Sequence, residues 1–365
     1  MSLTAIARSL GLSVTTVSRA LGGFSDVAAA TRMRVEAEAE RIGYHPHAAA
    51  RRLRSGRSEA VGVVLPSGPG QFDDPFFLRL LGGIGAGLAT HGFDLIVTAA
   101  RPGAAEMAAY RHLAEGRRVD GFIVARTRQH DARIGWLLDR GMPFVAHGRT
   151  MEPRSYAHLD IDGEAAFAAA TRRLIGFGHR RIGLINAPGE LMFSHHRAAG
   201  WCAALAEAGL PPGPSAEGEA TEETGMHLAT RLLRAAEPPT ALLCATDRLA
   251  AGALHAIGFA GLRAGQDISV IGYDNLPLST YTDPPLTTIE QPIDRAAERL
   301  VQILMALLGG ASPAGFADLW PARLVPRASD GPAPARSNRP RTGWTLQRPN
   351  RPSRGGHDVT GSNKT

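Results

Sequence analysis

The sequence predicts an all-α segment at the N-terminus, followed by a two-lobed α/β part built on two doubly wound parallel sheets. Residues 4–42 contain three short runs of helical periodicity, whereas short apolar strands alternate with amphipathic helices from residue 60 onward. This alternation occurs in two successive series, which indicates two lobes. At 365 residues the chain is also too long for a single core of usual size.

The first two predicted helices are joined by a tight turn. The apolar positions of the first recur at helical spacing: Leu3, Ile6, Ala7 and Leu10. Gly11 ends this helix, because only glycine takes a left-handed position without steric cost, and Ser13 is placed to cap the next one. In the second helix Val17 and Leu21 share a buried face, opposite Thr15 and Arg19. A braced helix that exposes Thr and Arg is what the DNA major groove accepts, although helical hairpins without this function are common.

A third helix from Thr31 to Ile42 is followed by an arginine-rich segment. Pro46 suits the start of a short helix that Gly56 closes. Four arginines crowd around Leu53 here. Arginines bind phosphates, and a leucine among them can wedge between base steps of the minor groove. The alternative is a basic linker with a chance leucine.

Residues 2–59 resemble the headpiece and hinge helix of LacI-family transcriptional regulators, the lactose and purine repressor family. The family pattern A-x-x-x-G-V-S-x-x-T-V-S-R-x-L appears as Ala7 to Leu21, with Leu12 replacing the valine. Its hinge pattern Y-x-P-N-x-x-A-R-x-L-[KR] appears as Tyr44 to Arg54. The similarity continues almost to residue 330. It implies a helix-turn-helix headpiece (1–45), a hinge helix and linker (46–59), and a bilobal, periplasmic-binding-protein-like effector-binding and dimerisation domain (60–330).

The resemblance also implies which residues contact DNA. Base reading falls on Val14, Thr15 and Arg19, and phosphate contacts fall on Ser13, Thr16 and Ser18. The implied hinge contacts, with Leu53 as the wedge, are His47, Ala50, Arg51, Leu53 and Arg54. Helical periodicity alone would instead bury Val14 with Val17. Three departures, Gly22 and His47 for asparagines and Ala28 for a serine, bear on operator preference rather than on DNA binding itself.

Charge and composition separate the N-terminal segment from the rest. The net charge is +6, yet residues 1–59 hold nine arginines against five acidic residues, and 331–365 holds six arginines and Lys364 against Asp358, so 60–330 is mildly acidic. An acidic core repels phosphate, which assigns DNA binding to the N-terminal segment. The tail 331–365 is predicted to be disordered. With two cysteines, no apolar run of membrane length and no secretory signal, the expected setting is the cytoplasm, with no membrane association.

The middle of the chain is predicted strand by strand. The strands of the first series are 60–65, 94–98, 121–125 and 144–146, with helices at 76–91, 104–115 and 132–140. In the second series, which begins near Ala157, strands at 182–185, 241–245 and 268–272 alternate with helices at 163–177, 197–208, 222–236 and 248–258. Lobe 1 is expected at about 60–157 and 288–315, and lobe 2 at about 158–287 and 316–330.

Ligands of open parallel sheets bind at the carboxyl ends of the strands, which here face the cleft between the lobes. Polar groups follow these strands, among them Asp74, His147 and Asn275, whereas Asp162 and Asp247 are interpreted as helix caps. Arginines and carboxylates suit adjacent sugar hydroxyls in a dry cleft. With the resemblance, the expected effector-binding residues are Asp73, Phe76, Arg126, Arg149, Phe193, Arg197, Thr246, Asp274 and Gln291. Thr246 and Gly148 replace polar residues of the family, and the Gly/Pro loop before Asp74 is similar to the α-glucoside-type branch.

The interpretation is a transcriptional repressor that binds double-stranded operator DNA as a homodimer or tetramer and senses a sugar or sugar derivative, without cofactor or metal. An enzyme is disfavoured, because the glycine run 82–87 lies inside a helix rather than after a strand, and His195 and His196 lack a third metal ligand. A transport-type sugar receptor shares the bilobal fold but has no use for the N-terminal segment. Deleting residues 1–59 would discriminate between the two.

Overall fold

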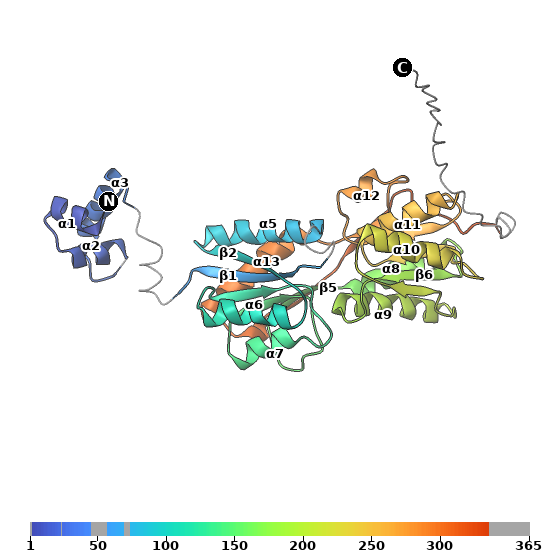
Figure 1. Cartoon of the computed structure of the whole chain (residues 1–365), viewed down its shortest axis with the longest axis horizontal. Coiled ribbons are helices and arrows are strands. Elements are labelled where there is room, and N and C mark those ends of the chain that lie inside the picture. Colours follow the sequence, from blue (N-terminus) through green and yellow to red (C-terminus); the bar gives the residue numbers. More distant parts are fainter. Residues whose placement is uncertain (1, 23, 45–56, 69–73, 336–365) are drawn as a thin grey trace, which may run out of the picture. The chain divides into compact units, whose positions relative to one another are not determined.

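The computed structural model describes residues 2–22, 24–44, 57–68 and 74–335. The predicted hinge residues His47, Ala50, Arg51, Leu53 and Arg54, the effector candidate Asp73 and the basic tail from residue 336 therefore lie outside the described part of the chain. Figure 1 gives the order of the elements along the sequence.

Three helices form the N-terminal unit: α1 (Leu3–Leu10), α2 (Val14–Leu21) and α3 (Ala29–Arg41). Gly11 ends α1 at φ +65°, and the Ser13 hydroxyl accepts a hydrogen bond from the Thr16 N–H (2.9 Å), so both predicted helix signals are confirmed. Each helix contributes to one small core of Ile6, Ala7, Val17, Ala20, Val35 and Ala39. Val14 is 43% exposed, so the burial that periodicity predicted for it is wrong. It is the first residue of an eight-residue helix, which is too short for the pattern to define its face.

The first lobe contains a six-stranded parallel sheet in the order β11-β5-β4-β3-β1-β2. Its strands are β1 (Ala60–Pro66), β2 (Asp94–Ala100), β3 (Gly121–Val124), β4 (Phe144–His147), β5 (His158–Ile161) and β11 (Ala317–Trp320). Alternate side chains of β1 point to opposite faces. Val61, Val63 and Leu65 pack against α5 (Pro75–Thr90) and α13 (Ile293–Leu308), whereas Ala60 and Val64 pack against α6 (Ala104–Glu115) and α7 (Ala132–Asp139).

The glycine run in α5 allows close helix packing, as predicted. A Cβ on Gly83 would lie 2.6 Å from the Ala297 Cβ of α13, and one on Gly87 would lie 3.2 Å from Val301. Glycine at these two positions lets the helices approach each other closely.

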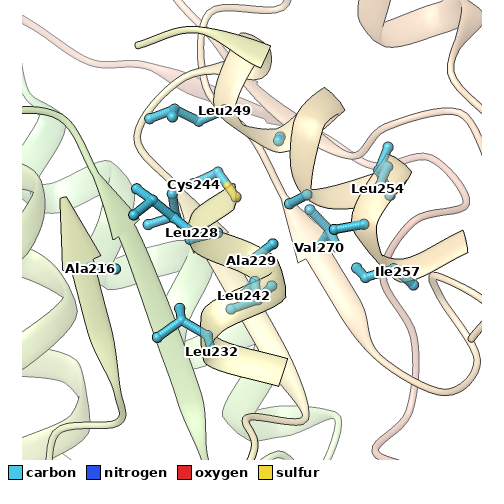
Figure 2. Packing of buried hydrophobic residues seen from close by; sticks show 14 of the residues in the cluster. Ala216, Leu228, Ala229, Leu232, Leu242, Cys244, Leu249, Leu254, Ile257 and Val270 are labelled. Atoms are coloured by element: carbon cyan, nitrogen blue, oxygen red, sulfur yellow. The ribbon is translucent and has the colours of Figure 1, made fainter. Parts of the chain in front are cut away.

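The second lobe contains a four-stranded parallel sheet in the order β7-β6-β8-β9. Its strands are β6 (Ile182–Asn186), β7 (Ser215–Glu217), β8 (Ala241–Cys244) and β9 (Ser269–Ile271). Helices α8 (Gly163–Gly176) and α9 (Met192–Glu207) cover one face, and α10 (Glu222–Leu233) and α11 (Asp247–Phe259) cover the other. Figure 2 shows the apolar side chains gathered between α10, α11 and the strands, with Leu228 and Leu232 near Cys244 and Leu242.

Short elements join and complete the lobes. β10 (Thr288–Glu290) pairs antiparallel with β12 (Arg323–Val325), and α12 (Leu278–Tyr281) and the 3₁₀ turn η1 (Pro313–Gly315) lie in connections. The chain passes between the lobes three times, after β5, β10 and β11. In the described part of the chain no helix is long and apolar enough to span a membrane.

Most predicted elements are present, and the elements after β9, among them α13, were not predicted. Further differences concern strand pairing, one helix start and one missed strand. β5 and β11 pair within the first sheet, although 158–161 and 316–320 were expected in lobe 2. Strand pairing is a long-range choice that the pattern of an isolated strand does not reveal. The helix expected to begin at Arg197 begins at Met192, and the three-residue strand β7 in a Pro/Gly-rich stretch was missed.

Candidate functional sites

The predicted DNA-contacting face lies on and before α2. Thr15 and Val14 are exposed there, and the Ser13 and Thr16 hydroxyls are 2.8 Å apart. The Arg19 guanidinium lies 4.6 Å from the centre of the Phe24 ring and donates to the Asp26 carboxylate at 2.5 Å. Phe24 and Asp26, which the sequence analysis did not name, thus hold the Arg19 side chain in position. Since the partner residues are themselves exposed, the ion pair leaves this arginine available to a ligand at the surface.

A pocket lies between the two lobes, at the carboxyl ends of the parallel strands. From the first lobe it is lined by Asp74, Phe76, Phe77, Arg126, Thr127, His147, Gly148, Arg149, Asp160 and Ile161. From the second lobe and the connections it is lined by Gly163, Met192, Phe193, His196, Arg197, Ala220, Thr246, Tyr273, Asp274 and Gln291. Every predicted effector-binding residue that the structure describes lies in this wall.

Arg197 is the main charged residue that the second lobe contributes to the pocket wall. It projects from α9, and its guanidinium carbon lies 3.6 Å from the centre of the Tyr273 ring and 4.5 Å from that of Phe193. One terminal nitrogen donates to the Ala245 carbonyl oxygen at the end of β8. Among the described residues, the Arg197 Nε, the Tyr273 hydroxyl and the His196 Nε2 are buried pocket-lining atoms without a hydrogen-bond partner. Buried polar atoms that lack a partner are costly, so these three favour a polar ligand.

Two buried carboxyl groups also line the pocket. Asp274 accepts a hydrogen bond from the Gln291 amide at 2.6 Å, and its backbone is held at φ +115°, a conformation that is strained for a residue with a side chain. Burial raises the pKa of Asp274 well above its usual range, while the positive charge of Arg197 opposes this shift. Asp74 accepts from the Phe76 N–H at the start of α5, and burial raises its pKa as well.

At the other end of the pocket, Arg149 donates to the Asp160 carboxylate at 2.8 Å. His147 is packed 5.8 Å from the Phe76 ring, and burial lowers its pKa. Burial lowers the pKa of His196 too, with Arg149 adding to the effect. Both imidazoles are therefore neutral near pH 7.

Hydrogen bonds close the lobes against each other beside the pocket. The Met192 N–H donates to the Thr127 carbonyl oxygen, and the Gln129 N–H donates to that of Glu190, both at 2.9 Å. Arg126 pairs with Glu219 at 2.9 Å. These contacts join the two lobes in the same place where the pocket residues meet.

Three further sequence interpretations are resolved by the geometry. Asp162 caps α8 through the Ala165 N–H, as predicted. Asp247 is not a cap: Thr246 caps α11, while Asp247 accepts from the Leu276 N–H (2.8 Å) and the Thr288 hydroxyl, and burial raises its pKa to about 7. Asn275, which also follows β9, binds Glu290 rather than lining the pocket.

Gly148 stands where the family has an aspartate, and the backbone explains why no side chain fits. Its φ is +109°, and a Cβ there would lie 2.5 Å from the Thr127 hydroxyl oxygen. The pocket residues that sequence reasoning missed include Asp160, Tyr273 and Met192. Their position in the sequence could have revealed them, because each lies at the end of a strand or the start of a helix that faces the cleft.

A compact three-helix unit whose second helix exposes polar side chains, joined to a bilobal domain with a polar pocket, is typical of DNA-binding transcriptional regulators. Residues 2–47 match the family model of bacterial regulatory proteins of the lacI family, and 171–329 match that of the periplasmic binding protein-like domain. The HTH-type transcriptional regulator AglR of Rhizobium meliloti is 40% identical over 346 residues, which cover 93% of this chain and 97% of the relative.

Two solved structures are similar over about nine tenths of this chain. The lac repressor dimer bound to operator and the anti-inducer ONPF has a TM-score of 0.80 at 28% identity, covering 91% of this chain and 99% of that one. The complex of the transcriptional regulator CelR with cellobiose has a TM-score of 0.70 at 26% identity, covering 90% and 99%. The chain belongs to the LacI family. It is a DNA-binding transcriptional regulator, not an enzyme.

Proposed function

We propose that this protein represses transcription by binding a palindromic operator as a dimer, and that a sugar or sugar derivative in the interlobe pocket changes its affinity for the operator. The observation that carries the proposal is the pocket itself. Arg197, Tyr273 and His196 offer it buried polar atoms without partners, beside the buried carboxyl group of Asp274. Sugar hydroxyls are donors and acceptors at once and fit both kinds of group, and the aromatic faces of Phe76 and Phe193 fit the apolar faces of a sugar ring.

Large apolar side chains on the surface support a dimer. Tyr281 of α12 is 86% exposed and Phe259 at the end of α11 is 76% exposed, and on the first lobe Leu78 of α5 and Val97 of β2 are also exposed. Exposed apolar side chains of this size are available to be covered by a second copy of the chain. A single headpiece reads one half-site and buries little surface, so a two-fold dimer on a palindromic site doubles the contact.

The interlobe contacts suggest how the ligand acts. Thr127 and Met192 both line the pocket, and their backbones are hydrogen-bonded to each other across the lobes. A ligand that contacts both lobes favours one relative arrangement of them, and this changes the spacing of the two hinge segments. Coupling between two such sites is typically about 1–3 kcal/mol, or about 5- to 150-fold in affinity.

A thermal-shift screen of neutral sugars on the full-length protein identifies the effector. Fluorescence anisotropy with operator DNA, selected from a random duplex library, then measures DNA affinity with and without that sugar at fixed salt. We expect at least one sugar to stabilise the protein and to change operator affinity by fivefold or more, and sedimentation to give a dimer at micromolar concentration. A monomer with and without DNA, or a bound sugar that leaves DNA affinity unchanged, would contradict the proposal. The α-glucoside-type ligand suggested by the loop before Asp74 is one member of this screen.

A further inference from the structure

The arginines that line the pocket are already engaged. Arg126 donates to Glu219 at 2.9 Å, and Arg149 donates to Asp160 at 2.8 Å. Arg197 donates to a backbone carbonyl oxygen and is flanked by two aromatic rings. No lysine is among the described lining residues, so Arg197 is the one cation there without a carboxylate at ion-pair distance.

The remaining ionisable groups do not add positive charge. Burial keeps the His147 and His196 imidazoles neutral, because the pKa of each is lowered. Three carboxyl groups, Asp74, Asp160 and Asp274, line the same pocket. An anion placed here would compete with these carboxyl groups for the arginines while losing its hydration, and burying a charge without a partner is costly.

Helix N-termini, the other common anion sites in α/β proteins, are occupied as well. The first turns of α5 and α8 are capped by carboxylates, those of Asp74 and Asp162, and α11 is capped by the Thr246 hydroxyl. At the start of α9 the Met192 N–H donates across the lobes to Thr127. At least one first-turn N–H is thus already paired at each of these four helices, which weakens their attraction for a phosphate.

We propose that the pocket accepts an uncharged saccharide and excludes phosphorylated sugars, and that Asp160 determines this specificity by neutralising Arg149. This inference rests on the proposed sugar-sensing function and defines the class of sugar. Arg149 lies at the same end of the pocket as His147 and His196, and Asp160 is its carboxylate partner there. Without that charge, Arg149 and Arg197 would face a ligand together.

The test compares Asp160→Asn with the wild-type full-length protein. Asparagine can keep the oxygen that accepts from the Ile161 N–H (2.9 Å), while it removes the charge and replaces the oxygen that accepts from Arg149 with an amide NH2 group. The probes are inorganic phosphate, glucose 6-phosphate and glucose, each measured by thermal shift and calorimetry against sodium chloride of equal ionic strength. Asp318→Asn is the matched control, because it removes a carboxylate from Arg299 (2.7 Å) outside the pocket.

We expect Asp160→Asn to bind phosphate and glucose 6-phosphate at least tenfold more tightly than the wild type, and Asp318→Asn to show no gain. An equal gain in Asp318→Asn, no gain in Asp160→Asn, or wild-type protein that binds glucose 6-phosphate more tightly than both phosphate and glucose would overturn the inference. If the Asp160→Asn variant does not fold, the affinities of the wild type for glucose 6-phosphate, phosphate and glucose still test whether the pocket excludes phosphorylated sugars. If no neutral sugar binds the wild type, the proposed function fails, whereas the gain of phosphate affinity still tests the role of Asp160.

Discussion

Replacing Arg197 with methionine isolates the ligand-binding role of the central pocket residue. Methionine retains an unbranched apolar side chain, and removes the guanidinium that lies over the Phe193 and Tyr273 rings and whose Nε has no partner. Because Arg197 lies in the interlobe pocket of the effector domain, the headpiece should be unaffected. We therefore expect effector binding to weaken while operator binding by the ligand-free protein is retained.

The expected loss follows from the hydrogen bonds that the guanidinium can make. One hydrogen bond to a charged group contributes about 1.5–3 kcal/mol, and tenfold in affinity corresponds to 1.4 kcal/mol, so the loss of one bond weakens effector binding roughly 10- to 150-fold. The bond to the Ala245 carbonyl oxygen is lost as well, and this affects folding stability rather than affinity.

Calorimetry with the sugar found in the screen gives the affinity, and anisotropy gives operator binding. Arg140→Met is the matched control, because Arg140 also stacks on an aromatic ring, that of Trp136 at 4.2 Å, but lies outside the pocket. Unchanged effector affinity in Arg197→Met, or an equal loss in Arg140→Met, would refute this reasoning. Loss of operator binding without effector would show that Arg197 acts on the fold instead.

Three further predictions concern stability and DNA binding. Burial raises the pKa of Asp247 to about 7, so the native protein binds a proton at this carboxyl group more tightly than the unfolded chain does. The protonated carboxyl group therefore contributes fully to stability below about pH 4, and this contribution is lost as the pH rises toward 7. Asp247→Asn should abolish roughly 2–3 kcal/mol of the fall in unfolding free energy between pH 5 and 8; denaturant titrations with the same pH slope in both proteins would contradict this. Arg19→Ala should reduce the discrimination between bases at one operator position by about 1–3 kcal/mol. Competition binding with single-base operator variants should show this loss at that position alone, and an equal loss at every position would contradict the assignment. Leu53→Ala, in the hinge outside the described residues, should sharply weaken specific operator binding and leave salt-sensitive non-specific binding nearly unchanged, so gel-shift titrations with wild-type affinity would exclude the wedge.

Local rules in the sequence predicted the turn and the helix cap of the headpiece. Gly11 and the Ser13 cap act within a few residues of themselves, and the structure confirms both. Val14 shows where local pattern fails: an eight-residue helix has only two turns, and which of its sides is covered is set by the neighbouring helices. The resemblance to the LacI family placed Val14 on the surface when periodicity did not.

In the effector domain the alternation of strands and helices predicted both lobes and the polar edge of each sheet. It could not assign β5 and β11 to a lobe, because their partners are chosen by pairing between distant segments: Ala317 pairs with His158. Asp247 was interpreted as a cap from its position after a strand. Only the folded chain brings Leu276 and Thr288 to its carboxyl group.

The sequence by itself determined most of the order of elements, the helix-turn-helix, and the polar strand ends with Arg126 and Asp274, because these follow from short-range periodicity, from caps and from the rule that parallel strands end at one edge. The resemblance to the LacI family added Arg197. The tertiary structure alone decided which charges are neutralised. Arg126 pairs with Glu219 across 93 residues of sequence, and Arg149 pairs with Asp160 from the neighbouring strand. Whether an arginine in the pocket can receive a ligand depends on such partners and on burial, and both are properties of the packed chain rather than of any segment of it.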